Sequence, residues 1–193
     1  MVTFREQVPA TSAATAPTAL LLPGAGYTAQ APLLYWTTAA LLAHGWRILT
    51  ADWGEPPESL NDGRARVRDS LDQFTDEVPD LIVAKSIGTF SLPWAVENAV
   101  PGVWLTPLLS EPDVVDALGA ADNRHIAIGG TADPYWVPAA VAGTHAVLHS
   151  VPGANHSLEL ADAEWMESAK AQFPLIELAV NHAIGVGRAG DHT

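Results

Sequence analysis

One stretch of the sequence carries the strongest structural signal: Leu81-Ile82-Val83-Ala84-Lys85-Ser86-Ile87-Gly88-Thr89. Its apolar first half is typical of a strand buried on both faces of a parallel sheet. Helical spacing begins at Gly88 and continues to Asn98, so Ser86 falls on a tight strand-to-helix turn. A strand and a helix that meet so closely need small neighbours, and Ala84 and Gly88 meet that need.

Other short apolar runs along the chain also end at turn signals, with helical spacing between them. The apolar runs cover 19–22, 48–51, 103–105, 126–128 and 146–148, and the helical stretches cover 32–44, 59–74, 112–121, 137–143 and 162–184. Alternating strands and helices predict an α/β fold with a mostly parallel central sheet and helices on both faces.

Length and composition indicate one folded domain. At ~150 residues per domain, the 193 residues leave room for a single domain over 1–193. Hydrophobic residues make up 48% and charged residues 16%, which argues against disorder. We expect poor order only at the ends, over 1–16 and 185–193.

Charge and residue usage exclude several classes of function. The net charge of −13 disfavours binding to nucleic acid or to an anionic membrane. The absence of cysteine excludes disulfides, thiolate zinc sites and cysteine nucleophiles. His145 and His149 would lie ~13 Å apart on a strand, too far for one metal, so we expect no metal and no organic cofactor.

The sequence also has no recognisable targeting signal. No apolar run near the N-terminus approaches the ~20 residues that span a membrane. We therefore expect a cytoplasmic protein that does not bind membranes, with its oligomeric state open.

Ser86 stands in a pattern of the form small-x-Ser-x-Gly, a variant of the nucleophile elbow Gly-x-Ser-x-Gly with Ala84 in the first position. A serine among small residues is more often an ordinary turn. Because this one follows a buried strand, we interpret it as a nucleophile.

A nucleophilic serine needs a base and an acid that orients the base. Asp133 follows the run 126–128, although it could instead cap the turn before Pro134. His156 follows the last apolar run. Since parallel strands end at the same edge of a sheet, we expect Ser86, Asp133 and His156 to converge there.

A glycine-rich loop, Pro23-Gly24-Ala25-Gly26-Tyr27, follows the first of these runs. Small residues let main-chain N–H groups approach an oxyanion, so Ala25 or Gly26 would donate together with Ile87. The alternative is a phosphate cradle, but the loop lacks the third glycine of a dinucleotide fingerprint and the Gly-Lys-Ser/Thr of a P-loop.

Together these motifs resemble those of small serine hydrolases of the α/β-hydrolase superfamily over residues 17–185, including the order Ser…Asp…His. The loop starts with Pro-Gly where many members have His-Gly. The resemblance implies cleavage of carboxylic esters or related acyl compounds through an acyl-Ser86 intermediate, with a small-molecule acyl substrate. Asp113 is the second candidate for the acid. The alternative function is a catalytically silent domain of this fold that binds a ligand or a protein partner.

Only residues 106–111 separate the run 103–105 from the next helical stretch, which leaves no room for a lid. We therefore expect an open site, with five apolar or aromatic side chains either as its walls or as plain core. These are Tyr27, Pro107, Leu108, Tyr135 and Trp136.

Lys85 is one of two lysines in the chain, with Lys170. We expect it to pair with a carboxylate such as Asp52. It could instead hold an anionic substrate group. A Ser-Lys pair of catalytic groups is disfavoured, because neighbouring side chains on a strand point to opposite faces.

Overall fold

The computed structural model describes residues 2–9, 16–74 and 77–189. Its strands are β1 (Thr3–Gln7), β2 (Thr18–Leu22), β3 (Arg47–Asp52), β4 (Leu81–Lys85), β5 (Gly102–Leu105), β6 (His125–Gly130) and β7 (Val147–Val151). They form one seven-stranded sheet in the order β1-β3-β2-β4-β5-β6-β7. β1 is antiparallel to β3, and the other neighbours are parallel, so the predicted α/β architecture is confirmed.

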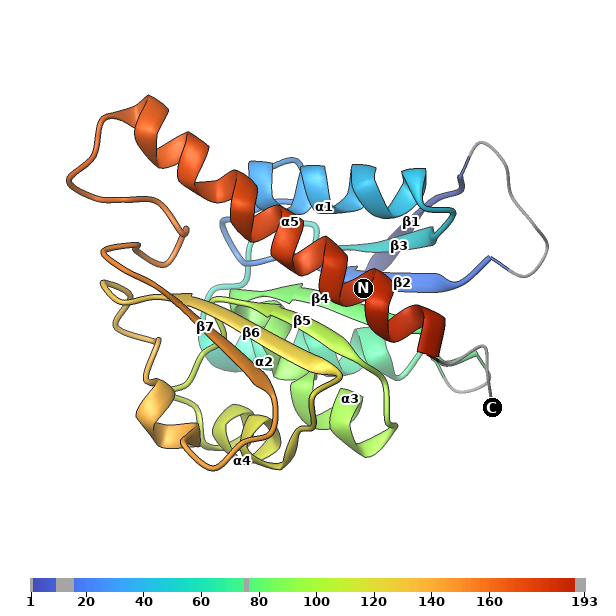
Figure 1. Ribbon diagram of the computed structural model, residues 1–193. Helices are drawn as coiled ribbons and strands as arrows, with labels where there is room; N and C mark the ends of the chain where they lie inside the picture. Colours follow the sequence, from blue (N-terminus) through green and yellow to red (C-terminus); the bar gives the residue numbers. More distant parts are fainter. Residues whose placement is uncertain (1, 10–15, 75–76, 190–193) are drawn as a thin grey trace.

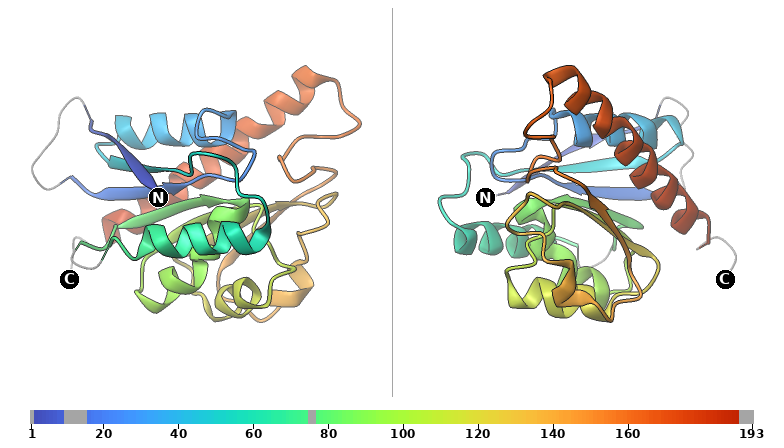
Figure 2. Two further views of the ribbon diagram at one scale, coloured as in Figure 1. Left: turned by 180° about the vertical axis from the view of Figure 1, so that it is seen from behind. Right: turned by 60° about the vertical axis from the view of Figure 1, so that its left-hand side comes forward.

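Helices cover both faces of this sheet (Figure 1). They are α1 (Pro32–Ala43), α2 (Leu60–Leu71), α3 (Leu92–Glu97), α4 (Pro112–Ala120) and α5 (Trp165–Ala189), with 3₁₀ turns η1 (Ser86–Ser91) and η2 (Pro138–Val141). α1 and α5 pack together on one face, and α2, α3 and α4 lie on the other (Figures 1 and 2).

The central strands are buried on both faces, and this burial explains why their sequences are apolar without alternation. All residues of β2 and β4 are buried. Leu21 packs into the core under α1 and α5, whereas Leu20 and Leu22 pack into the core on the opposite face. A strand covered on both faces has no position at which a polar side chain reaches water.

β1 is an element that the sequence did not predict. It pairs only with β3, as an edge strand, and most of its side chains are exposed. An edge strand needs no continuous apolar run, so Thr3–Gln7 carries no strong strand signal. The expected poor order over 1–16 is therefore wrong at 3–7, while 1 and 10–15 lie outside the described residues.

Some predicted boundaries differ from those observed. The last helix begins at Trp165 and ends at Ala189, so residues 185–189, which we expected to be frayed, are helical. Residues 190–193 lie outside the described residues. The helix expected from Gly88 starts as the 3₁₀ turn η1 at Ser86 and becomes α-helical at Leu92.

The connections at one edge of the sheet position the candidate site. β2, β4, β6 and β7 lead there into the loops that contain Gly24, Ser86, Asp133 and His156. Residues 106–111 join β5 directly to α4, so the predicted lid-less architecture is confirmed. Among the described residues, no helix is both long and apolar enough to cross a membrane.

Candidate active site

Ser86 occupies the sharp turn between β4 and η1. Its φ is 53°, in the left-handed region that a non-glycine residue rarely adopts. The neighbouring glycine explains how the turn fits: a Cβ on Gly88 would lie 2.2 Å from the carbonyl oxygen of Leu22. Ala84 is fully buried. The predicted need for small residues on both sides of Ser86 thus has a steric cause in the approach of η1 to β2.

The glycine-rich loop after β2 lies directly against this turn. A Cβ on Gly24 would be 3.3 Å from the Cβ of Ser86. Within the described residues, the main-chain N–H groups of Ala25, Gly26 and Ile87 have no hydrogen-bond acceptor. These three predicted donors are therefore available to an oxygen bound beside Ser86.

Asp133 lies beyond the end of β6, and its side chain is fully buried. Its Oδ1 accepts a hydrogen bond from the main-chain N–H of Tyr135 at 3.0 Å, and its Oδ2 lies 2.7 Å from Nδ1 of His156. The residue thus makes the contacts expected for both of the alternatives that the sequence left open. It organises its own turn with one oxygen and contacts the histidine with the other.

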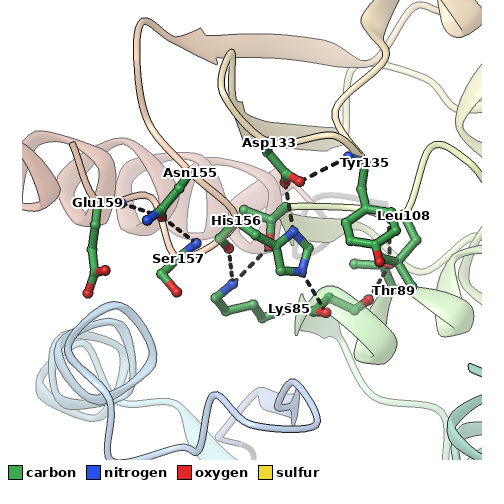
Figure 3. A network of polar contacts seen from close by, with 11 residues as sticks. Lys85, Thr89, Leu108, Asp133, Tyr135, Asn155, His156, Ser157 and Glu159 are labelled. Carbon is green, nitrogen blue, oxygen red and sulfur yellow. Dashed lines mark hydrogen bonds and ion pairs between the residues drawn. The ribbon is translucent and has the colours of Figure 1, made fainter. Parts of the chain in front are cut away.

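His156 completes a hydrogen-bonded series (Figure 3). Its Nε2 lies 2.8 Å from Oγ of Ser86, while its Nδ1 faces Asp133. The ring of Tyr135 stands edge-on to the imidazole, with the ring centres 5.1 Å apart. The structure therefore brings together the three side chains that the sequence selected from different loops.

Close main-chain contact between the two loops makes this series possible. A Cβ on Gly130 would lie 2.0 Å from the carbonyl oxygen of Ala154, so only glycine lets the chain after β6 approach the histidine loop. The N–H of Ala132 donates to that same carbonyl at 3.0 Å.

The loop that carries His156 is held by residues that the sequence motifs do not single out. Oδ1 of Asn155 accepts hydrogen bonds from the N–H groups of Ser157 and Glu159, at 2.8 and 3.1 Å. From α5, Nε2 of Gln172 donates to the carbonyl oxygens of Ser157 and Leu158. An asparagine beside a loop histidine is the only local signal, because asparagine side chains commonly bond their own turn.

Burial lowers the pKa of His156 below its usual value of 6.5. The hydrogen bond that His156 donates to Asp133 opposes this effect, and the positive charge of Lys85 adds to it. The net lowering of the pKa favours the neutral imidazole. A neutral imidazole that shares its Nδ1 proton with Asp133 can accept a proton at Nε2.

The predicted pairing of Lys85 with Asp52 is wrong. Lys85 is 1% exposed. Its Nζ donates to Oγ1 of Thr106 at 2.8 Å and to the carbonyl oxygen of His156 at 2.7 Å (Figure 3), and it lies 4.5 Å from the centre of the Tyr27 ring. Asp52 is exposed instead and accepts a hydrogen bond from the N–H of Gly54. The long lysine side chain reaches neutral oxygens of the neighbouring loops before it can reach a carboxylate.

Burial also changes the titration of this lysine. Desolvation lowers the pKa of Lys85 to about 8, although the charges of Asp133 and Glu159 act in the opposite direction. The ammonium group is therefore a buried positive charge without a carboxylate in ion-pair contact among the described residues.

A cavity of about 450 Å³ opens at Ser86. Tyr27, Leu108 and Tyr135 line it as predicted, together with Leu60 and Ser157, which the sequence did not single out.

Two of the five predicted wall residues are core residues instead. Trp136 is buried against Gly129, and its Nε1 donates to Oγ of Ser150 at 2.9 Å. Pro107 is also buried and does not line the cavity. The positive φ of Thr106, 46°, turns the chain so that Leu108 is the residue of this loop that reaches the site.

The second candidate for the acid lies elsewhere. Asp113 stands in the first turn of α4 and forms an ion pair with Arg64. In the described part of the chain, no three histidine, aspartate or glutamate side chains cluster in a way that could hold a metal ion.

Comparison with known proteins identifies the fold. No protein-family model matches the chain, and no curated protein sequence does. Among solved structures, dienelactone hydrolase from Anabaena variabilis is similar with a TM-score of 0.65 and 16% identity, over 95% of this chain and 91% of that one.

Two further solved structures have the same architecture. A serine hydrolase without a lid from Xanthomonas campestris has a TM-score of 0.61 and 17% identity, over 93% of this chain and 88% of that one. Est1E from Butyrivibrio proteoclasticus has a TM-score of 0.61 and 14% identity, over 93% and 95%. The chain therefore has the α/β-hydrolase fold.

Proposed function

We propose that this protein is a serine hydrolase that cleaves carboxylic esters or related acyl compounds, such as thioesters, through an acyl-Ser86 intermediate. One observation carries the proposal. Oγ of Ser86, the imidazole of His156 and the carboxylate of Asp133 form a continuous series, with contacts of 2.8 and 2.7 Å. Such a series lets a serine hydroxyl lose its proton as it attacks a carbonyl carbon.

In the first half of the reaction, Oγ of Ser86 attacks the acyl carbon while Nε2 of His156 takes its proton. Asp133 stabilises the resulting imidazolium through Nδ1–H. The oxyanion of the tetrahedral intermediate lies within reach of the N–H groups of Ile87 and of Ala25 or Gly26, which have no acceptor among the described residues. His156 then gives the proton to the leaving alcohol or thiol, and the acyl group stays on Ser86.

Water completes the cycle by the same steps. His156 takes a proton from a water molecule that attacks the acyl carbon, and the second tetrahedral intermediate collapses as the proton passes to Oγ of Ser86. The products are a carboxylic acid and the regenerated serine. The φ of 53° at Ser86 supports this role, because strained backbone is retained where the surrounding structure holds a functional group in place.

The open cavity supports small or extended acyl substrates. Within the part of the chain that the structure describes, no lid closes over it, and its walls combine Tyr27, Leu60, Leu108 and Tyr135 with the polar main chain of the glycine-rich loop. A largely apolar wall with a few polar donors suits an ester better than a highly charged ligand.

An activity probe tests the proposal against the alternative of a silent binding domain. A fluorophosphonate reacts with an activated serine, so the folded protein should be labelled at Ser86. Ser86→Ala should abolish labelling, while Ser110→Ala, which changes an exposed serine after β5, should retain it. A panel of esters, thioesters and amides then identifies the substrate class. Folded wild-type protein that is not labelled at Ser86 would favour the silent domain.

A further inference from the structure

A second cavity adjoins the candidate active site on the other side of the glycine-rich loop. Its outer part, about 210 Å³, shares Gly24 and Ala25 with the cavity at Ser86. Its inner part, about 340 Å³, continues between the edge strands and α1. The two parts share Arg5, Ala29, Gln30 and Thr50, and we call them together the α1 trough.

The α1 trough arises from the way β1 is added to the sheet. Arg5 lies opposite Thr50 in the antiparallel pair β1–β3, so the two side chains stand on the same face of the sheet. α1 covers that face next to the edge strands (Figures 1 and 2). The side chains of Arg5 and Gln7 on this edge are polar, so the space beneath α1 is not closed by apolar packing.

Two buried hydroxyl groups in the trough lack partners. Thr38 and Thr50 are 7% and 5% exposed, and neither Oγ1 makes a hydrogen bond in the described part of the protein. Both line the inner part. Thr37, next to Thr38 on α1, shows how a buried threonine hydroxyl in a helix usually finds a partner, since its Oγ1 donates to the carbonyl oxygen of Leu33 at 2.7 Å. A buried hydroxyl without a partner costs stability, so a pair facing one cavity indicates a polar ligand.

The charges of the trough indicate what kind of ligand fits. Arg5 lines both parts and forms no ion pair with any described residue, in a chain whose net charge is −13. Asp52 lines only the outer part, and its Oδ1 accepts the N–H of Gly54. The inner part therefore has a guanidinium and, covered by neighbouring atoms, two unpaired hydroxyls, without an acidic side chain among its lining residues. A carboxylate bound to the guanidinium can accept hydrogen bonds from these hydroxyls once the threonine side chains rotate toward it.

The connection to Ser86 passes over small residues. Gly24 and Ala25 form the boundary shared with the active-site cavity, so nothing larger than a methyl group projects from it. Nε1 of Trp53, which also lines the outer part, donates to the carbonyl oxygen of Pro23 at 3.2 Å and fixes this boundary. An extended substrate bound at Ser86 can therefore continue into the trough.

We propose that the α1 trough binds the part of the substrate remote from the scissile bond, and that Arg5, Thr38 and Thr50 bind a carboxylate there. The inference rests on the proposed hydrolase function and assigns its substrate class: esters that carry a carboxylate at the far end of an extended chain.

Matched pairs of esters test the inference. For the acyl side, 4-nitrophenyl hydrogen glutarate, adipate and pimelate are compared with the neutral 4-nitrophenyl esters of the same carbon number. For the alcohol side, the butyrate ester of 6-hydroxyhexanoic acid is compared with hexyl butyrate. The readout is the ratio of kcat/KM for the anionic ester to that for its neutral partner. We expect the ratio to be highest at one chain length in one of the two series.

Three variants connect the preference to the trough. Arg5→Gln should lower the best ratio about tenfold, as for the loss of a charge-assisted hydrogen bond. Thr38→Val and Thr50→Val should each lower it severalfold without lowering the melting temperature, because each removes an unpaired buried hydroxyl. Arg68→Gln, an equal change of charge on the exposed side of α2, should leave the ratio unchanged. The inference is overturned if Arg5→Gln and both threonine variants leave the ratio of kcat/KM values unchanged in both series.

A binding measurement separates this inference from the proposed function. Free adipate should raise the melting temperature of the Ser86→Ala protein but not that of the same protein carrying Arg5→Gln. Hydrolysis of the neutral esters without any carboxylate preference or adipate binding would overturn the inference and leave the hydrolase intact. Adipate binding in a protein that hydrolyses no ester and takes no fluorophosphonate would instead overturn the hydrolase and leave a carboxylate-binding trough.

Discussion

The ammonium group of Lys85 lies 2.7 Å from the main-chain carbonyl oxygen of His156 and donates a hydrogen bond to it. The same group donates to Oγ1 of Thr106 at 2.8 Å. One buried side chain thus ties the end of β4, the loop after β5 and the loop that carries the imidazole to one another. The residue next to Ser86 therefore helps to hold the side chain that faces Ser86.

The first prediction concerns the pH dependence of catalysis. In the wild-type protein, kcat/KM should rise with pH through an apparent pKa below 6.5, because only the neutral imidazole accepts the serine proton and burial lowers the pKa of His156. Since the charge of Lys85 also lowers that pKa, Lys85→Met should move the acidic limb to higher pH. A pH profile of kcat/KM for a neutral 4-nitrophenyl ester measures both.

Thr106→Val is the matched control for this effect. It removes an acceptor of the Lys85 hydrogen bond but leaves the positive charge in place, so the acidic limb should stay where it is in the wild type. An acidic limb that moves equally in both variants would mean that loop distortion, and not charge, sets the pKa of His156.

The second prediction concerns stability at alkaline pH. The pKa of Lys85 is 10.5 in the unfolded chain and about 8 in the folded protein. Between these values the unfolded chain binds more protons, so this group makes the free energy of unfolding increase as the pH rises from about 8 to 10.5. The total gain is a few kcal/mol at most. Denaturant unfolding at several pH values should show the increase in the wild type relative to Lys85→Met, and parallel curves for the two proteins would contradict it.

The third prediction concerns Ser86→Ala. This change removes the proposed attacking oxygen and little else, so kcat should fall by about 10³–10⁶ while the circular dichroism spectrum and melting temperature stay close to those of the wild type. Substantial turnover by the folded variant would exclude an acyl-Ser86 intermediate.

The fourth prediction is that Asp133 and His156 act as one unit with Ser86. Asp133→Asn and His156→Ala should each lower kcat by orders of magnitude, and the double variant should be little worse than the more damaged single variant. Asp113→Asn is the control, because Asp113 pairs with Arg64 and does not contact the histidine. Steady-state kinetics of these four variants measure the losses in kcat. Losses that add up in the double variant would argue against Asp133 and His156 acting in the same step.

The fifth prediction concerns the turn that holds Ser86. Gly88→Ala places a Cβ 2.2 Å from the carbonyl oxygen of Leu22, so η1 must move away from β2. The free energy of unfolding should fall by about 2 kcal/mol or more, with a loss of activity. Gly119→Ala, on the exposed side of α4 with no atom near the added methyl group, should instead stabilise the protein by up to ~1 kcal/mol. Thermal unfolding of the two variants measures both changes in stability. A Gly88→Ala protein that is as stable as the wild type would contradict the prediction.

The sequence by itself determined the strand-and-helix alternation and the convergence of Ser86, Asp133 and His156. Both depend on strong local rules. A strand buried on both faces must be apolar throughout, and parallel strands place the loops that follow them at one edge of a sheet. Positions such as Gly88 are likewise readable, because a turn this tight tolerates no side chain.

Only the tertiary structure decided the partners of Lys85, the place of Trp136 and the existence of the α1 trough. These depend on which distant residues come within reach once the sheet has formed: Thr106 and His156 beside Lys85, Gly129 beside Trp136, and Thr50 of β3 opposite Arg5 of β1. A side chain's partners are set by the three-dimensional arrangement of elements far apart in the chain. Local sequence patterns carry no record of that arrangement.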